Sequence, residues 1–230
     1  MTDVSDDSTK EYTLSLQEAR QLADAAASSL SDRIQIAALT RKSKLPFKVL
    51  SLREVLLHRV SSLATSAVDH FERSQDIPAV VLTRAVVETV AVAFALHERI
   101  SRFLEAKNTA DLDGFLMRAL LGGRNQPGKP SATNVLTLVD RVDKTFPGFR
   151  SMYDDLCEYT HPNWAGTLGS FGKIDKEALE LKLGPNKRSA AGTIGVATLS
   201  GALAIFHHFY NDSADLVRQL NDYFEQGGSH

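Results

Sequence analysis

Apolar residues recur at helical spacing along most of the chain. Near the N-terminus, "SLQE" at residues 15–18 has the pattern of a capping box, in which a serine caps the helix and a glutamate reaches back to its first backbone donor. The apolar stripe that follows could extend through residues 32–42. We therefore predict a first helix that begins at about residue 15, after a polar, disordered segment at residues 1–13.

Two prolines and a second capping box mark the next two predicted helices. Pro46 lacks a backbone donor and disfavours helix at the residue before it, so residues 42–50 should interrupt the helical pattern. "SLRE" at residues 51–54 then predicts a helix that runs to about residue 73. Pro78 suits the first turn of a third helix, which the apolar run predicts over about 79–103.

Three shorter helical patterns follow. "NTADLDGFLMRALLGG" predicts a helix that ends at a pair of glycines, and a loop rich in proline and glycine comes after it at residues 124–132. Residues 132–146 are amphipathic at helical spacing. "FRSMYDDLCEYTH" predicts one more short helix, which must end before Pro162.

The period of the pattern changes near residue 170. "ALELKLG" at residues 178–184 alternates between apolar and polar positions, so we predict a small β-hairpin between about 170 and 184. A long helix over about 189–225 completes the chain. The predicted fold is all-α: a helical bundle with a small β-hairpin insertion before a long C-terminal helix. We expect one bundle domain over residues 14–226, with residues 227–230 belonging to a tag linker.

Composition narrows the class of protein. The formal net charge of −2 gives no global basic field, and the single cysteine excludes an internal disulfide and a zinc site made of cysteines. Segments 79–96 and 189–206 approach the length of a membrane span, but charges interrupt the first and small or polar residues dilute the second. We expect both to be buried helices of a cytoplasmic protein that holds no cofactor or metal and does not associate with a membrane.

Two charges stand inside the most apolar segment. In "LTRAVVETVAVAFAL", Arg84 and Glu88 lie one helical turn apart, so their side chains should meet on one face. A structural interpretation is an ion pair that fixes the register of a core helix. A functional interpretation places the pair at the rim of a cleft, where Glu88 holds Arg84 toward a phosphate or carboxylate.

The segment "CEYTHPNWAG" at residues 157–166 contains the densest group of polar and aromatic residues. His161 should end a helix, where the helix dipole favours its protonated form. One interpretation is a helix end with a hydrogen-bonded histidine and a core tryptophan, Trp164. The other makes His161 a general acid–base, with Tyr159 or Asn163 orienting it.

Basic residues gather in three predicted loops, at residues 41–48, 124–129 and 182–188. Runs of charge are usually solvated loops. If the three loops shared one face of the molecule, they would form a phosphate-binding surface. The pattern along the chain leaves that arrangement open.

"LTRAVVET" followed by "YDDLCEYTHPNWAG" resembles an uncharacterised bacterial all-helical family, whose members carry an arginine–glutamate pair in a core helix and a "Y-x-x-L-(S/C)-x-Y-x-H-P" segment. The resemblance covers roughly residues 45–175. That family is itself distantly similar to the HEPN superfamily, compact helical bundles that often dimerise. Many HEPN proteins act as metal-independent ribonucleases in toxin–antitoxin and antiviral defence systems, and others only bind partners or nucleotides.

One departure from the HEPN ribonuclease pattern concerns the arginine. That pattern places an arginine a few positions before the histidine, where this chain has Asp154, Asp155 and Leu156. If the chain cleaves RNA, the arginine has to come from elsewhere, and Arg84 is the candidate.

Two functional hypotheses follow. The first is a HEPN-like protein that binds or cleaves RNA, or binds a nucleotide, in a stress or phage-defence setting, with Arg84 and His161 in one cleft. The second is a non-catalytic dimerising or adaptor module. Gly192, Gly195 and Gly201 allow close approach to the C-terminal helix, which is apolar on nearly every side. This helix is therefore expected either to be buried centrally or to complete a homodimer interface.

Overall fold

The computed structural model describes residues 4–123, 126–186 and 189–228. Within these ranges the chain forms eight α-helices, one 3-10 helix and one β-hairpin. The all-α prediction with a small hairpin before a long C-terminal helix is confirmed. The elements in chain order are α1 Val4–Ser28, η1 Ile36–Ala38, α2 Leu45–Glu72, α3 Asp76–Ala106, α4 Thr109–Leu121, α5 Val135–Thr145, α6 Phe149–Thr160, α7 Leu168–Phe171, β1 Gly172–Asp175, β2 Glu180–Leu183 and α8 Ala190–Glu225.

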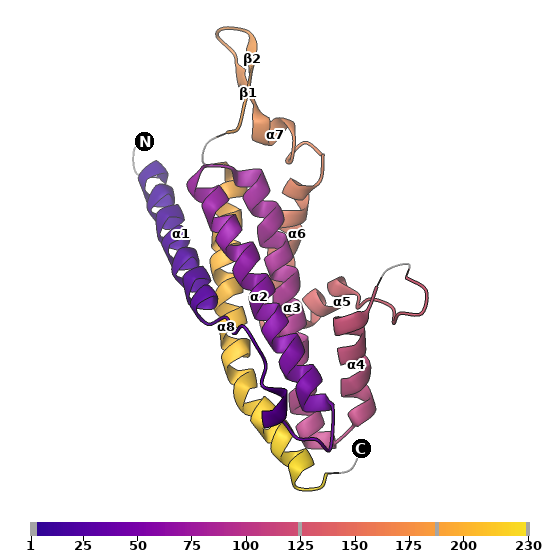
Figure 1. The fold of residues 1–230 in the computed structure, drawn as a ribbon. Coiled ribbons are helices and arrows are strands. Elements are labelled where there is room, and N and C mark those ends of the chain that lie inside the picture. Colours follow the sequence, from indigo (N-terminus) through magenta and orange to yellow (C-terminus); the bar gives the residue numbers. More distant parts are fainter. Residues whose placement is uncertain (1–3, 124–125, 187–188, 229–230) are drawn as a thin grey trace.

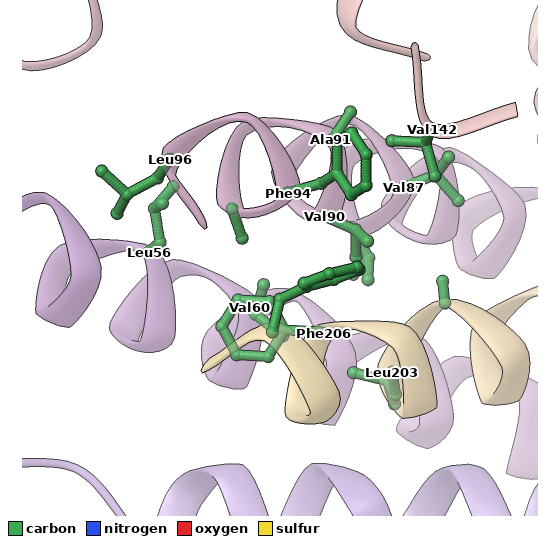
Figure 2. Packing of buried hydrophobic residues seen from close by; sticks show 14 of the residues in the cluster. Leu56, Val60, Val87, Val90, Ala91, Phe94, Leu96, Val142, Leu203 and Phe206 are labelled. Atoms are coloured by element: carbon green, nitrogen blue, oxygen red, sulfur yellow. The ribbon is translucent and has the colours of Figure 1, made fainter. Parts of the chain in front are cut away.

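Helices α3 and α8 lie at the centre of the bundle. They pack against each other along their lengths, with α2 beside both and α1 covering α2 and α8 (Figure 1). Figure 2 shows Val90 and Phe94 of α3, Phe206 of α8 and Val60 of α2 among the side chains that fill the core. All four side chains are almost completely buried, so the central helices are held mainly by hydrophobic burial.

The N-terminal segment differs from the prediction. Residues 4–13, which were expected to be disordered, belong to helix α1, so Ser15 lies inside the helix and does not begin it. Tyr12 packs against the core and donates a hydrogen bond to the backbone carbonyl of Phe71 at 3.4 Å. This contact with α2 stabilises turns whose own sequence is too polar to predict them.

Helix α2 also begins earlier than predicted. It starts at Leu45, with Pro46 in its first turn, where the missing backbone donor has no helical partner to lose. The proline therefore initiates this helix, and "SLRE" at residues 51–54 lies within it. Glu54 is buried in the bundle and does not act as a capping residue. Helix α1 ends at Ser28, so the predicted extension through residues 32–42 is wrong.

The beginnings of α3 and α8 are joined by one buried carboxylate. Asp76, in the first turn of α3, accepts hydrogen bonds at Oδ2 from the backbone amide of Ser189 at 3.1 Å and from its hydroxyl at 2.7 Å. Ser189 in turn caps α8 by accepting from the amide of Gly192. Negative charge is favourable here because the positive ends of both helix dipoles lie at this point.

Gly195 and Gly201 of α8 differ in their surroundings inside the chain. A Cβ on Gly195 would lie 2.8 Å from the Phe71 ring and 2.8 Å from Val80, so this glycine lets α8 approach α2 and α3 closely. At Gly201 no atom would lie within 4 Å of an added Cβ. Central burial of this helix is observed, since it packs along α3 and against α1 and α2.

The hairpin projects beyond one end of the bundle (Figure 1). Its strands β1 and β2 pair antiparallel, with Ile174 opposite Leu181 and Gly172 opposite Leu183. All four residues of β2 are exposed. The hairpin therefore adds little to the core and extends into solvent from the segment between α7 and α8.

Candidate functional site

Arg84 and Glu88 meet as predicted, and a tyrosine joins them. Arg84 Nε lies 3.4 Å from Glu88 Oε1, and both Nε and one terminal nitrogen of Arg84 donate to the Tyr153 hydroxyl, at 3.3 and 3.1 Å. The Tyr153 hydroxyl donates to Glu88 Oε1 at 3.0 Å. The result is a hydrogen-bond chain from guanidinium to phenol to carboxylate that connects α3 to α6.

Partial burial governs the electrostatics of this chain. Burial raises the pKa of Tyr153 above its ordinary value, the hydrogen bond from Arg84 opposes that rise, and Glu88 adds to it. Burial lowers the pKa of Arg84, but its bond to Tyr153 and nearby negative charge give a net rise. The Arg84 and Glu88 side chains are 32% and 29% exposed, so the pair lies at the edge of the core and not inside it.

Arg84 reaches the residue next to His161 but not His161 itself. The remaining terminal nitrogen of Arg84 donates to the Thr160 hydroxyl at 3.2 Å, and Thr160 donates to the carbonyl of Cys157 at 3.0 Å. The His161 side chain is exposed and makes no hydrogen bond with the residues that the structure describes. The expected pairing of Arg84 with His161 in one cleft is therefore not formed directly.

His161 has extended backbone and caps the C-terminal end of α6. A tight turn follows it. Asn163 accepts from the amide of Gly166 at 3.1 Å and donates to Glu158 at 2.8 Å. A Cβ on Gly166 would lie 2.1 Å from the His161 carbonyl oxygen, so the turn needs a glycine there. Asn163 thus shapes the turn, and its side-chain hydrogen bonds in the described part of the chain go to Glu158 and Gly166, not to the histidine ring.

The two aromatic residues of this segment lie in different surroundings. Tyr159 is partly buried and packs against the core. Trp164 is 73% exposed, so the interpretation of a core tryptophan is wrong. Its ring lies over Gly169, where an added Cβ would come within 3.3 Å of two ring carbons. Trp164 therefore belongs to the surface at the base of the hairpin.

A more deeply buried charged network was not predicted. Arg53 and Glu54 of α2 form an ion pair in which each side chain is only 12% exposed. The Arg53 guanidinium stacks on the Tyr210 ring at 3.6 Å and donates to the Ser213 hydroxyl at 3.0 Å. Tyr210 donates to Glu54 at 3.2 Å. One feature of the sequence indicates that Glu54 is buried, because this residue lies on the same helical face as apolar residues of α2. Its spacing from a serine, however, also fits a helix cap.

The first basic segment lines a pocket of about 530 Å³ between the beginnings of α2 and α4. Arg41, Lys42 and Lys44 contribute cations, and Ser43 and Thr109 contribute hydroxyls. The acidic residue in the lining, Asp113, is paired with Lys48 at 2.5 Å. Backbone donors at a helix N-terminus favour anions, and here they stand beside three cationic side chains.

The basic segments do not share one face. Lys42 donates to the backbone carbonyl of Glu225 at 2.5 Å, near the end of α8, whereas the hairpin leads into the beginning of that helix. Because α8 has 36 residues, these ends are about 54 Å apart. Lys182 is occupied by an ion pair with Asp175. Arg124, Lys187 and Arg188 lie outside the described residues.

No metal-binding group of three His, Cys, Asp or Glu residues occurs in the described part of the chain. Helices α3 and α8 are each long and apolar enough to cross a membrane. However, 67% of the most apolar window of α3 and 56% of that of α8 are buried in the bundle. Core helices of a folded domain have this combination of length and burial.

Compared with protein-family models, curated proteins and solved structures, the chain gives no significant match.

Proposed function

We propose that the protein binds the phosphate group of a nucleotide in the pocket formed by the loop before α2 and the beginning of α4. The observation that carries this proposal is the concentration of Arg41, Lys42 and Lys44 around one cavity. Arg41 and Lys44 are exposed and form no ion pair with the described residues. Their charge is therefore available to an anion, and the two helix N-termini add to the positive potential.

The size of the pocket favours a small ligand. Its volume of about 530 Å³ is within the range of roughly 300–1,000 Å³ that small-molecule sites occupy. Long RNA is usually held by a basic groove that follows many phosphates. In this chain the basic segments at residues 41–48 and on the hairpin are at opposite ends of the bundle (Figure 1). A single nucleotide therefore fits the arrangement better than an extended strand.

The proposal is tested by calorimetric titration of the purified chain with adenosine monophosphate, inorganic phosphate and adenosine. Both phosphate compounds should bind, more weakly at high salt, and adenosine should not. Replacing Arg41 and Lys44 together with alanine should weaken binding by at least about tenfold. The control replaces Lys144 and Lys176 with alanine, which changes the net charge equally but leaves the pocket intact. Equal affinity in the two double variants contradicts the proposal.

RNA cleavage is a second candidate, favoured by one observation. His161 is exposed beside Thr160, which is bonded to Arg84, so an arginine and a histidine occupy neighbouring surface positions. Incubating total RNA with the wild type and with His161→Ala, in the presence of a chelator, separates cleavage from binding. Loss of cleavage in a variant with unchanged melting temperature supports catalysis. Intact RNA with both proteins leaves nucleotide binding as the function.

A further inference from the structure

The hairpin, here called the arm, comprises residues 172–183. Its internal pairing places like charges opposite each other, Lys173 against Lys182 and Asp175 against Glu180. Like charges directly across a strand pair are unfavourable. The diagonal ion pair of Lys182 with Asp175, at 2.7 Å, relieves only part of this. The charge pattern of the arm is therefore poorly matched to its own fold.

The arm also exposes one apolar face. Ile174 and Leu181 lie opposite each other and are 69% and 49% exposed, and Leu183, two residues along on the same face, is 80% exposed. The face continues toward α7, because a Cβ on Gly172 would touch both Leu168 and Leu181. Contiguous exposed apolar surface bordered by charge is typical of an interaction site.

The order of charges along β2 is complementary to an antiparallel copy of the same strand. Glu180 and Lys182 flank Leu181, so an antiparallel copy of β2, related by a two-fold axis at Leu181, would present a lysine opposite each glutamate. Leu181 would then face Leu181 of the second copy. We propose that β2 pairs with β2 of a second copy of this chain, forming a four-stranded sheet across a homodimer.

The arm is less suited to binding partners other than a second copy of this chain. Residues 172–183 contain three lysines and three acidic residues, so no net positive charge attracts an anionic membrane surface. In the described part of the chain β2 pairs only with β1, and its outer edge therefore has unused backbone donors and acceptors. The beginning of β1, in contrast, is contacted by α7 through Leu168. This inference does not depend on nucleotide binding, because the pocket is at the other end of α8.

Glu180→Lys provides a sharp test. Inside the arm, this substitution replaces a repulsive pair with an attractive one between the introduced lysine and Asp175, so the hairpin itself is stabilised. In the dimer it places the introduced lysine opposite Lys182 of the second copy. The dissociation constant from sedimentation equilibrium should therefore rise by at least about tenfold relative to the wild type.

Two further variants complete the experiment. Lys173→Glu is the matched control, because it also relieves a like-charge pair in the arm but lies on β1, so the dimer should persist. Mixing Glu180→Lys with Lys182→Glu should restore association as a heterodimer, since opposite charges again face each other. A monomeric wild type throughout the micromolar range overturns the inference. So does equal association of wild type and Glu180→Lys, or equal weakening by Lys173→Glu.

Discussion

At the scale of single residues, the charged pair in the apolar segment belongs to a network with more partners than its spacing indicates. Arg84 uses its guanidinium nitrogens on Glu88, Tyr153 and Thr160. Because about a third of each charged side chain is exposed, water screens the pair. The penalty for breaking it should be smaller than for a fully buried pair, and the pair has a structural role in joining α3 to α6.

Arg84→Ala is expected to lower the free energy of unfolding by about 1–3 kcal/mol, because Tyr153 and Thr160 lose a hydrogen-bond donor and Glu88 loses its ion-pair partner. Replacing Arg84 with methionine and Glu88 with leucine together should cost less, since no charge is left unpaired. Urea denaturation measures both changes, with Arg218→Ala as a control in an exposed pair. A double variant that is less stable than Arg84→Ala would show that the ion pair itself is needed.

At the scale of helices, small residues determine how closely the central elements pack. Gly195 and Gly201 both lie inside α8, but only Gly195 faces a neighbouring helix at close range. The helix was expected either to be buried centrally or to complete a homodimer interface. Gly195 contributes to central burial, because it lets α8 approach Phe71 and Val80 of the same chain closely.

Exchanging each of these glycines for alanine should have opposite effects. Gly195→Ala should destabilise the protein by about 1–3 kcal/mol, because the new methyl group overlaps Phe71 and Val80. Gly201→Ala should stabilise it by about 0.5–1 kcal/mol, since alanine restricts the unfolded backbone and meets no atom. Thermal and urea unfolding of both variants check this. Similar stability changes at the two positions would contradict the packing of α8.

At the scale of the whole molecule, two tyrosine-centred networks link helices that are distant in sequence. Tyr153 connects α6 to α3, and Tyr210 connects α8 to α2. Burial raises the pKa of Tyr210, as it does that of Tyr153, and Glu54 adds to the rise while Arg53 opposes it. Both networks therefore require neutral phenols.

Stability should accordingly fall at alkaline pH. A tyrosine whose pKa is raised in the folded state keeps its proton while the unfolded chain begins to lose its own. Its contribution is therefore complete below pH of about 10 and is lost as the pH rises through the folded pKa. Tyr153→Phe should be less stable near neutral pH but should lose less stability between about pH 9 and 11. Urea unfolding of the wild type and of Tyr153→Phe across this range gives the slope of the unfolding free energy against pH for each protein. Identical slopes would contradict the raised pKa of Tyr153.

Patterns within about thirty residues were sufficient to predict much of the fold. Helical periodicity located the core helix, observed over Asp76–Ala106, and strict alternation located the hairpin. The spacing of Arg84 and Glu88 was enough to predict their contact, because residues four apart on a helix are neighbours. These features depend on local geometry, which the order of residues specifies directly.

Tertiary contacts decided the rest. Tyr153 is 65 residues from Glu88, and Tyr210 is 156 residues from Glu54, so no local period could reveal these partners. Helix α1 continues to Val4 where Tyr12 contacts α2, and Trp164 is exposed although its apolar surface suggested the core. The basic segments at residues 41–48 and on the hairpin lie near opposite ends of α8. Packing brings distant residues together, and their individual preferences are too weak to specify which ones meet.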